Sequence, residues 1–162
     1  MEKKYFPLYV DISKKKIVVI GGGTIATRRV HTLVEFAEQI VVVAPDVTAE
    51  LATLIDNDKV TWIRESYEKS QIQDAEIVVA ATNQPQINHR IKKDCQLLEK
   101  ESNRQVLVSV VDDKTLCDFY FPSIVQTQDT VIGINSGGKS PALTKRLRQK
   151  IEEILNSESI YH

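Results

Sequence analysis

The chain has 162 residues, 42% of them hydrophobic, which is enough for the core of one domain with a small additional segment. Its formal net charge of −1 would not recruit nucleic acid or a membrane surface, and its apolar runs are too short to span a bilayer. The two cysteines form no CxxC pair and the three histidines show no metal-ligand spacing, so we expect a cytoplasmic protein with reduced thiols and no metal site.

Short β-branched runs alternate with helical stretches over the first two thirds of the chain. Strands that are apolar on both faces and separated by helices indicate an α/β fold with a parallel sheet covered on both sides. We expect the strand order 3-2-1-4-5. In chain order, the sequence predicts strands over 16–20, 39–44, 59–65, 75–82 and 105–111, and helices over 24–36, 46–56 and 85–100, with Asp46 as the N-cap of the second helix.

The pattern changes after residue 111. The segments 117–126 and 129–135 are strand-like but only a short turn apart, which predicts an antiparallel hairpin. A final helix is expected over 141–155, with Ser140 as its cap and Pro141 in its first turn. The predicted domain limits are 1–112 for the parallel-sheet domain, 113–155 for the hairpin and last helix, and 156–162 for a tail.

A glycine-rich turn joins the first predicted strand to the first helix. Residues 21–26 read Gly-Gly-Gly-Thr-Ile-Ala and match G-x-G-x-x-A in the strand–turn–helix context of a Rossmann-like fold. Gly21 would allow the tight turn, Gly23 the close approach of a pyrophosphate, and Ala26 close packing of helix on strand. The motif predicts dinucleotide binding at the helix N-terminus; the alternative is a glycine turn that serves packing only.

The acid that would bind the adenosine ribose is displaced in this sequence. Ala44 stands at the end of the second strand, where that acid normally lies, and Asp46 follows two positions later, 20 residues after Ala26. No arginine or lysine stands near Asp46 in the sequence to bind a 2′-phosphate. The pattern therefore favours NAD over NADP.

A second glycine motif, "GINSGGKS" at 133–140, matches the phosphate-binding loop of nucleoside triphosphatases. We reject that interpretation because Gly133 is expected inside a hairpin strand rather than in a loop of a parallel βαβ unit. No strand is predicted after the following helix to supply the second magnesium-binding acid. A local role remains open: the helix N-terminus together with Lys139 could hold a carboxylate or phosphate.

Two acids follow the fifth predicted strand. Ligands of open α/β sheets bind beyond the carboxyl ends of the strands, so Asp112 or Asp113 could accept a proton there. Aspartate pairs also commonly start turns, and from spacing alone the turn is the favoured interpretation.

Taken together, five segments resemble the precorrin-2 dehydrogenases, which include the N-terminal domain of siroheme synthases. The matching segments cover nearly the whole chain in order: "FPLYVDISKKKIVVIGGGTIATRRV", "VVVAPD", "EIVVAATNQPQIN", "VSVVDDKTLCDFYFPS" and "INSGGKSPALTKRLRQKIE". The resemblance implies NAD-dependent oxidation of precorrin-2 to sirohydrochlorin, on the route to siroheme. It also implies a homodimer formed through roughly residues 113–145, with no nucleic-acid or membrane partner.

The resemblance also assigns residues. Asp112 matches the family's catalytic aspartate, and Ser136, with Lys139 nearby, is assigned to the substrate cleft. The predicted cofactor-binding set is Gly21, Gly23, Thr24, Ile25, Pro45, Asp46 and Thr82.

The sequence departs from the family pattern in two respects. Members usually carry Asn where this chain has Ser109, and they continue into a small helical domain after the segment that corresponds to 141–155. Two other functions stay open at this point: a bifunctional enzyme that also inserts iron into sirohydrochlorin, and an NAD-binding sensor without catalysis.

Overall fold

The computed structural model describes residues 6–137 and 139–157, and the predicted tail lies outside this part from residue 158 onward. The chain forms two compact units, which are treated separately here. The larger unit runs from Val10 to Phe119. The smaller one contains the described residues before Val10 and after Phe119.

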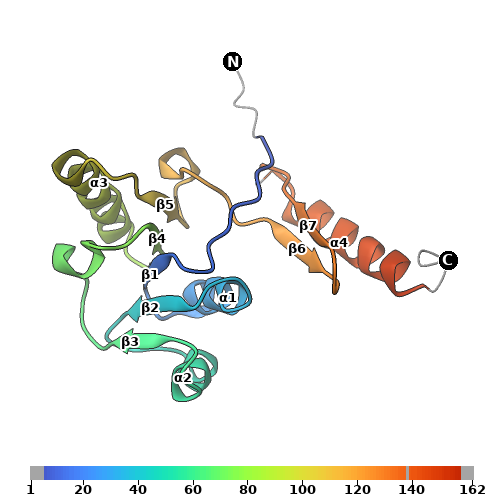
Figure 1. Cartoon of the computed structure of the whole chain (residues 1–162), viewed down its shortest axis with the longest axis horizontal. Coiled ribbons are helices and arrows are strands. Elements are labelled where there is room, and N and C mark those ends of the chain that lie inside the picture. Colours follow the sequence, from blue (N-terminus) through green and yellow to red (C-terminus); the bar gives the residue numbers. More distant parts are fainter. Residues whose placement is uncertain (1–5, 138, 158–162) are drawn as a thin grey trace. The chain divides into compact units, whose positions relative to one another are not determined.

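The larger unit is built on a five-stranded parallel sheet in the order β3-β2-β1-β4-β5, which confirms the predicted topology (Figure 1). The central strand β1 pairs in parallel with β2 on one side and β4 on the other. Four of the five strands are shorter than predicted, at one or both ends. The strands are β1 (Lys16–Ile20), β2 (Gln39–Val43), β3 (Thr61–Ile63), β4 (Ile77–Ala80) and β5 (Leu107–Val110).

The sheet interior explains why these runs form strands. The side chains from Ile17 to Ile20 are at most 1% exposed, and those from Ile77 to Ala80 at most 4%. Each fully buried branched side chain contributes roughly 1.5–3 kcal/mol relative to an exposed one. Both faces of the sheet must therefore be covered, and Figure 1 shows α1 and α2 on one side and α3 on the other. These helices are α1 (Thr24–Leu33), α2 (Ala49–Asp56) and α3 (Pro85–Ser102), with short 3-10 turns η1 (Lys69–Ile72) and η2 (Lys114–Leu116).

The start of α2 corrects one sequence-based prediction. Asp46 is not the N-cap: the helix begins at Ala49, and the cap is Thr48, whose Oγ1 accepts from the Leu51 N–H at 3.2 Å. Thr48 also shares a hydrogen bond of 2.8 Å with Thr27 of α1. This second contact, to a neighbouring helix, favours Thr48 over Asp46 and leaves the Asp46 carboxylate available for another role.

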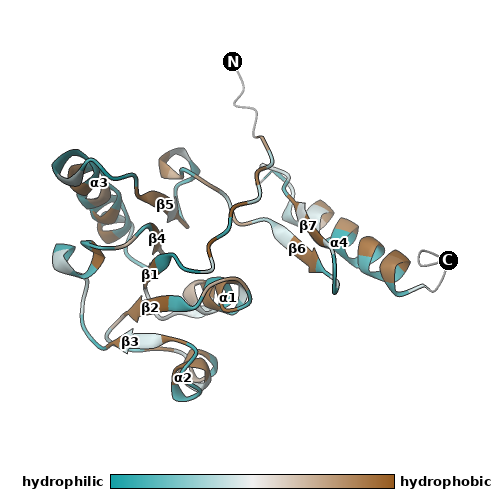
Figure 2. Ribbon diagram, in the orientation of Figure 1, coloured by the Kyte–Doolittle hydropathy of each residue, from teal (hydrophilic) through white to brown (hydrophobic). Residues whose placement is uncertain are grey.

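In the smaller unit, β6 (Ser123–Gln126) and β7 (Val131–Ile134) form the predicted antiparallel hairpin. The strand expected from residue 117 begins only at Ser123. Helix α4 (Pro141–Asn156) follows, and Ser140 caps it as predicted by accepting from the Leu143 N–H. Figure 2 shows both hydrophobic and hydrophilic stretches along α4, and its exposed apolar side chains are Leu143, Leu147 and Ile154.

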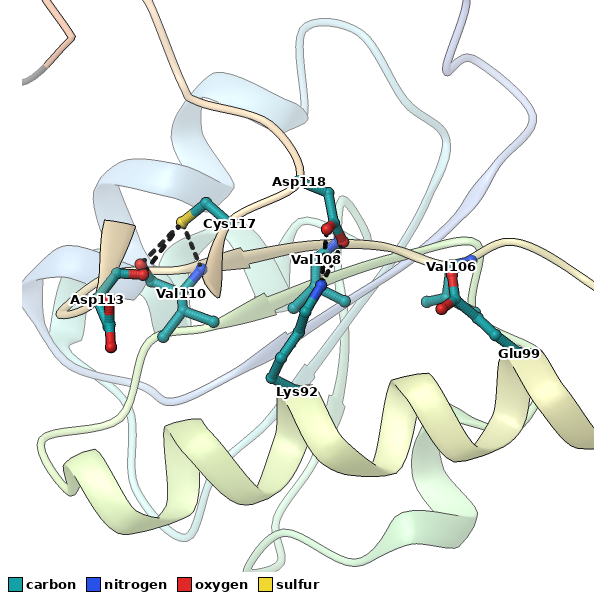
Figure 3. Close-up of polar contacts among 8 residues, drawn as sticks. All are labelled: Lys92, Glu99, Val106, Val108, Val110, Asp113, Cys117 and Asp118. Atoms are coloured by element: carbon teal, nitrogen blue, oxygen red, sulfur yellow. Dashed lines mark hydrogen bonds and ion pairs between the residues drawn. The ribbon is translucent and has the colours of Figure 1, made fainter. Parts of the chain in front are cut away.

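Side chains cover the outer edge of β5, which is an edge strand of the sheet (Figure 3). The N–H groups of Val106, Val108 and Val110 each donate to a side chain instead of to another strand. The acceptors, in the same order, are the carboxylates of Glu99 and Asp118 and the sulfur of Cys117, at 2.9, 2.9 and 3.2 Å. Lys92 of α3 completes this arrangement, because its ammonium donates to both Asp118 oxygens at 2.7 Å.

We expect Lys92→Met to lower the free energy of unfolding by about 1–3 kcal/mol. Removing one partner of a fully buried ion pair costs about 3–5 kcal/mol, and here the Asp118 side chain is still 35% exposed, which reduces the penalty. Lys69→Met is the control, because its pair with Glu101 is more exposed and such pairs contribute about 0–1 kcal/mol. Urea unfolding of both variants measures the difference. Equal losses would contradict this account of the β5 edge.

Candidate functional site

The glycine turn after β1 contains two glycines that the backbone requires and one that it does not. Gly21 has a φ of +123°, and a Cβ there would lie 2.3 Å from the carbonyl oxygen of Ala81. A Cβ on Gly22 would lie 2.0 Å from the carbonyl oxygen of Asp46. A Cβ on Gly23 would meet no atom within 4 Å. Packing therefore explains Gly21 and Gly22, whereas Gly23 leaves open space in front of the α1 N-terminus.

A cleft of about 690 Å³ lies at this turn, at the carboxyl ends of the central strands. All seven residues of the predicted cofactor-binding set line it: Gly21, Gly23, Thr24, Ile25, Pro45, Asp46 and Thr82. The first turn of α1 carries no acidic residue that would repel an anion from the helix N-terminus. Open space at Gly23, the N–H groups that a helix N-terminus leaves without intrahelical partners, and a carboxylate at Asp46 are together the features that a dinucleotide requires. The cleft therefore fits NAD or NADP.

The surroundings of Asp46 correct a second expectation from the sequence. An arginine does stand near this residue: the Arg64 guanidinium, which follows β3, lies 3.6 Å from Asp46 Oδ1. Arg64 Nε also donates to the carbonyl of Pro45 at 3.3 Å. The contact could not be predicted from the sequence, because Arg64 is 18 positions away and reaches Asp46 only when β3 pairs with β2.

A buried amide connects the cleft to Asp112. Asn88 of α3 is 0% exposed. Its Oδ1 accepts from the backbone N–H of Thr82 at 3.1 Å and from the Thr82 hydroxyl at 2.8 Å. Its Nδ2 donates to the Thr82 carbonyl at 3.1 Å and to Asp112 Oδ1 at 3.0 Å. All four hydrogen-bonding positions of the amide are used, so Asp112 is held in a fixed position relative to a residue that lines the cleft.

Sequence reasoning missed Asn88, although a signal was present. It precedes the buried residues Ile91 and Cys95 by three and seven positions, so it occupies the apolar face of α3. A polar amide at such a position must find partners in the interior.

The neighbouring Asp113 has the turn role that spacing suggested for the pair. Its Oδ1 accepts from the N–H and the hydroxyl of Thr115, at 2.9 and 2.6 Å, and so caps η2. These hydrogen bonds lower the pKa of Asp113, with a smaller contribution from His89 at 3.5 Å. The two aspartates therefore have different roles: Asp112 is connected to the cleft through Asn88, and Asp113 stabilises a turn.

Comparison with known proteins now bears on this cleft. Residues 8–123 match the family model "Putative NAD(P)-binding", and this match includes the glycine turn, the cleft and Asp112. The chain belongs to this NAD(P)-binding family. A siroheme synthase of Mannheimia succiniciproducens is 37% identical over 93% of this chain and 30% of its own length. One of Psychrobacter cryohalolentis is 36% identical over 93% of this chain and 28% of its own length.

These relatives confirm the resemblance found in the motifs, and the chain spans about 30% of the length of the first of them. The solved structure "SirC, precorrin-2 dehydrogenase" superposes with a TM-score of 0.71, covering 93% of this chain and 71% of that one. Its sequence identity is 24%, so it supports the fold of this NAD(P)-binding family member.

The cleft of this family member also contains a cation that the sequence did not reveal. Arg90 of α3 lines the cleft, lies 5.5 Å from the ring centre of Tyr67, and pairs with Glu68 and Asp94 at 3.6 Å each. Burial, together with a 2.9 Å hydrogen bond to Asp94, raises the pKa of Tyr67 far above its usual range. Tyr67 therefore remains a neutral donor and fixes Asp94 beneath the guanidinium.

The two residues predicted to bind substrate belong to the smaller unit. Ser136 Oγ accepts from the Ser140 N–H at 3.3 Å and from the Thr144 hydroxyl at 3.1 Å, at the start of α4. Lys139 lies in the same turn, where its N–H donates to the Ser136 carbonyl. Their contact with substrate stays a prediction. Gly133 lies inside β7, as expected when the triphosphatase interpretation was rejected, and Gly138 is outside the described residues.

The described residues add neither a metal site nor a membrane-spanning helix to this picture. Residues 6–137 and 139–157 contain no group of three or more His, Cys, Asp or Glu side chains placed to hold a metal ion. Within the same residues, no helix is both long and apolar enough to cross a membrane.

Proposed function

We propose that this chain is an NAD-dependent dehydrogenase that oxidises precorrin-2 to sirohydrochlorin in siroheme biosynthesis. The observation that carries the proposal is the connection from the dinucleotide cleft through Thr82 and Asn88 to Asp112. The names of the siroheme synthase relatives support the pathway. The family match supports a nicotinamide cofactor, and the choice of NAD rests on Asp46 at the cleft.

The residues of the cleft have separate roles in this proposal. The α1 N-terminus, with Gly23, Thr24 and Ile25, would bind the pyrophosphate, and Asp46 would bind the adenosine ribose. The nicotinamide, when bound, supplies the hydride acceptor. Oxidation of precorrin-2 releases one hydride and one proton. Because Asn88 occupies Oδ1 of Asp112, we assign Oδ2 of that carboxylate as the atom that accepts the proton.

The remaining parts of the proposal concern assembly and location. The homodimer implied by the resemblance would use the hairpin and α4, whose exposed Leu143, Leu147 and Ile154 offer apolar surface for a second copy. A cytoplasmic location agrees with the unpaired state of Cys95 and Cys117.

The direct test follows the absorbance of precorrin-2 mixed with the purified protein, with and without NAD. We expect the sirohydrochlorin spectrum to appear only with NAD, together with an equal amount of NADH. NAD binding with no product would indicate the non-catalytic sensor. Subsequent addition of iron tests for chelation, which would show as a further spectral change faster than in the protein-free control.

A thermal-shift experiment distinguishes the two glycine motifs. NAD should raise the melting temperature with occupancy, because a ligand at 100 times its dissociation constant stabilises the native state by about 2.7 kcal/mol. Mg-ATP should cause no shift and should not be hydrolysed, since Gly133 lies in the hairpin strand β7. A shift with Mg-ATP and none with NAD would reverse the assignment of the two motifs.

A further inference from the structure

Two side chains of the β3 region hold the segment that carries Asp46. Trp62 Nε1 donates to the carbonyl of Ala44 at 2.9 Å, and Arg64 Nε donates to the carbonyl of Pro45 at 3.3 Å. The Arg64 guanidinium lies 5.3 Å from the Trp62 ring centre and 3.6 Å from Asp46 Oδ1. Three consecutive residues after β2 are thus each contacted by Trp62 of β3 or by Arg64, which follows β3.

The Asp46–Arg64 pair contributes little to stability. The side chains are 87% and 70% exposed, and ion pairs this exposed typically contribute about 0–1 kcal/mol. The pair is nevertheless located at the cleft, because Asp46 lines it at the predicted ribose position. The pair is therefore better placed to act on a bound ligand than to stabilise the fold.

The two partners have opposite preferences for a dinucleotide. A carboxylate at this position accepts hydrogen bonds from the ribose 2′-hydroxyl of NAD, whereas a guanidinium binds the 2′-phosphate of NADP. Besides Asp46, the charged residues that line the cleft are Glu65, Glu68 and Arg90. Arg64 lies outside this lining, in contact with Asp46. Arg90 pairs with Glu68 at 3.6 Å, so Glu65 and Asp46 leave this end of the cleft net negative unless Arg64 compensates.

We propose that Asp46 and Arg64 form a cofactor-selecting pair, in which Asp46 both binds the ribose of NAD and occupies the guanidinium that would otherwise bind the 2′-phosphate of NADP. Arg64 is then a masked phosphate site. It also orients Asp46, which compensates for the late position of this acid after β2. The inference rests on the proposed function, because it assumes that the cleft binds a nicotinamide dinucleotide.

The experiment measures dissociation constants of NAD and NADP by calorimetry for the wild-type chain, Asp46→Asn, Arg64→Met and the double variant. Wild type should prefer NAD. Asp46→Asn should weaken NAD and strengthen NADP, each by about tenfold, because it removes the ribose acceptor and frees the guanidinium. The double variant should lose the gain in NADP affinity. Melting temperatures should be nearly equal throughout, since the pair is exposed.

Each other outcome overturns the inference. No gain in NADP affinity in Asp46→Asn would show that Arg64 is not a masked site. A gain that persists in the double variant would show that repulsion by Asp46 alone selects the cofactor. If the folded wild-type chain binds neither dinucleotide, the proposed function fails together with the inference. If it binds NAD but the variants do not behave as expected, only the inference about the Asp46–Arg64 pair fails.

Discussion

Asp112→Asn is expected to lose most of its turnover of precorrin-2, by about 10²–10⁴-fold, the usual contribution of a positioned acid–base group. Asparagine has the same size but cannot accept the proton that accompanies hydride transfer. Its Oδ1 can still accept the hydrogen bond from Asn88, so the link to Thr82 and the cleft should persist. The affinity for NAD should therefore stay at the wild-type value. Single-turnover absorbance measures the turnover of precorrin-2, and calorimetry measures the affinity for NAD.

Asp113→Asn is the matched control. The side-chain oxygen of asparagine can still accept from the Thr115 N–H and keep the cap of η2, so turnover should remain close to wild type. Wild-type rates in both variants would mean that water accepts the proton and that the cleft only positions the substrate. Loss of folding in Asp112→Asn would mean that Asp112, too, is a turn residue.

Gly23→Val should lose NAD affinity by about ten- to a hundredfold while the fold persists. A side chain at this position meets no protein atom within 4 Å, so it can be accommodated in the free protein. It would occupy the space assigned to the pyrophosphate, and forcing extra methyl groups into an occupied site costs about 1–3 kcal/mol. Calorimetry with NAD and a circular dichroism melt measure the two effects.

Gly22→Ala should instead destabilise the fold, because its Cβ would lie 2.0 Å from the carbonyl oxygen of Asp46, a backbone atom that cannot move aside easily. We expect a lower melting temperature in this variant, although Gly22 is the variable position of the G-x-G motif.

Unchanged NAD affinity in a folded Gly23→Val variant would contradict the assignment of this loop to the cofactor site.

The parts of the fold that sequence predicted are those set by hydrophobic periodicity. The uninterrupted apolar runs of β1 and β4 required burial on both faces, and this requirement led to a parallel sheet covered by helices. The strand order was then expected for such a unit with right-handed crossovers. The hairpin followed from the short turn between β6 and β7. The glycine motif predicted the turn that borders the cleft, because its strand–turn–helix context is local in sequence. The lining residues Thr24, Ile25 and Pro45 came from the family resemblance.

Contacts that form only after strands and helices pair could not be predicted in this way. Asp46 and Thr48 are both good caps, and a hydrogen bond from another helix decided between them. Arg64 reaches Asp46 only through the register of β3 on β2. Asn88 appeared as one polar residue on an apolar helix face, and its partners lie 6 and 24 positions away.

The covering of β5 has a consequence for self-association. An uncovered edge strand offers a row of N–H and C=O groups on which another chain can add a strand, and this is a route to aggregation. Here Val106, Val108 and Val110 already donate to side chains of Glu99, Asp118 and Cys117. An incoming strand would have to displace two carboxylates, one of them held by Lys92. Two copies of this chain therefore cannot readily join their sheets across β5, and any assembly of the protein has to use a different surface.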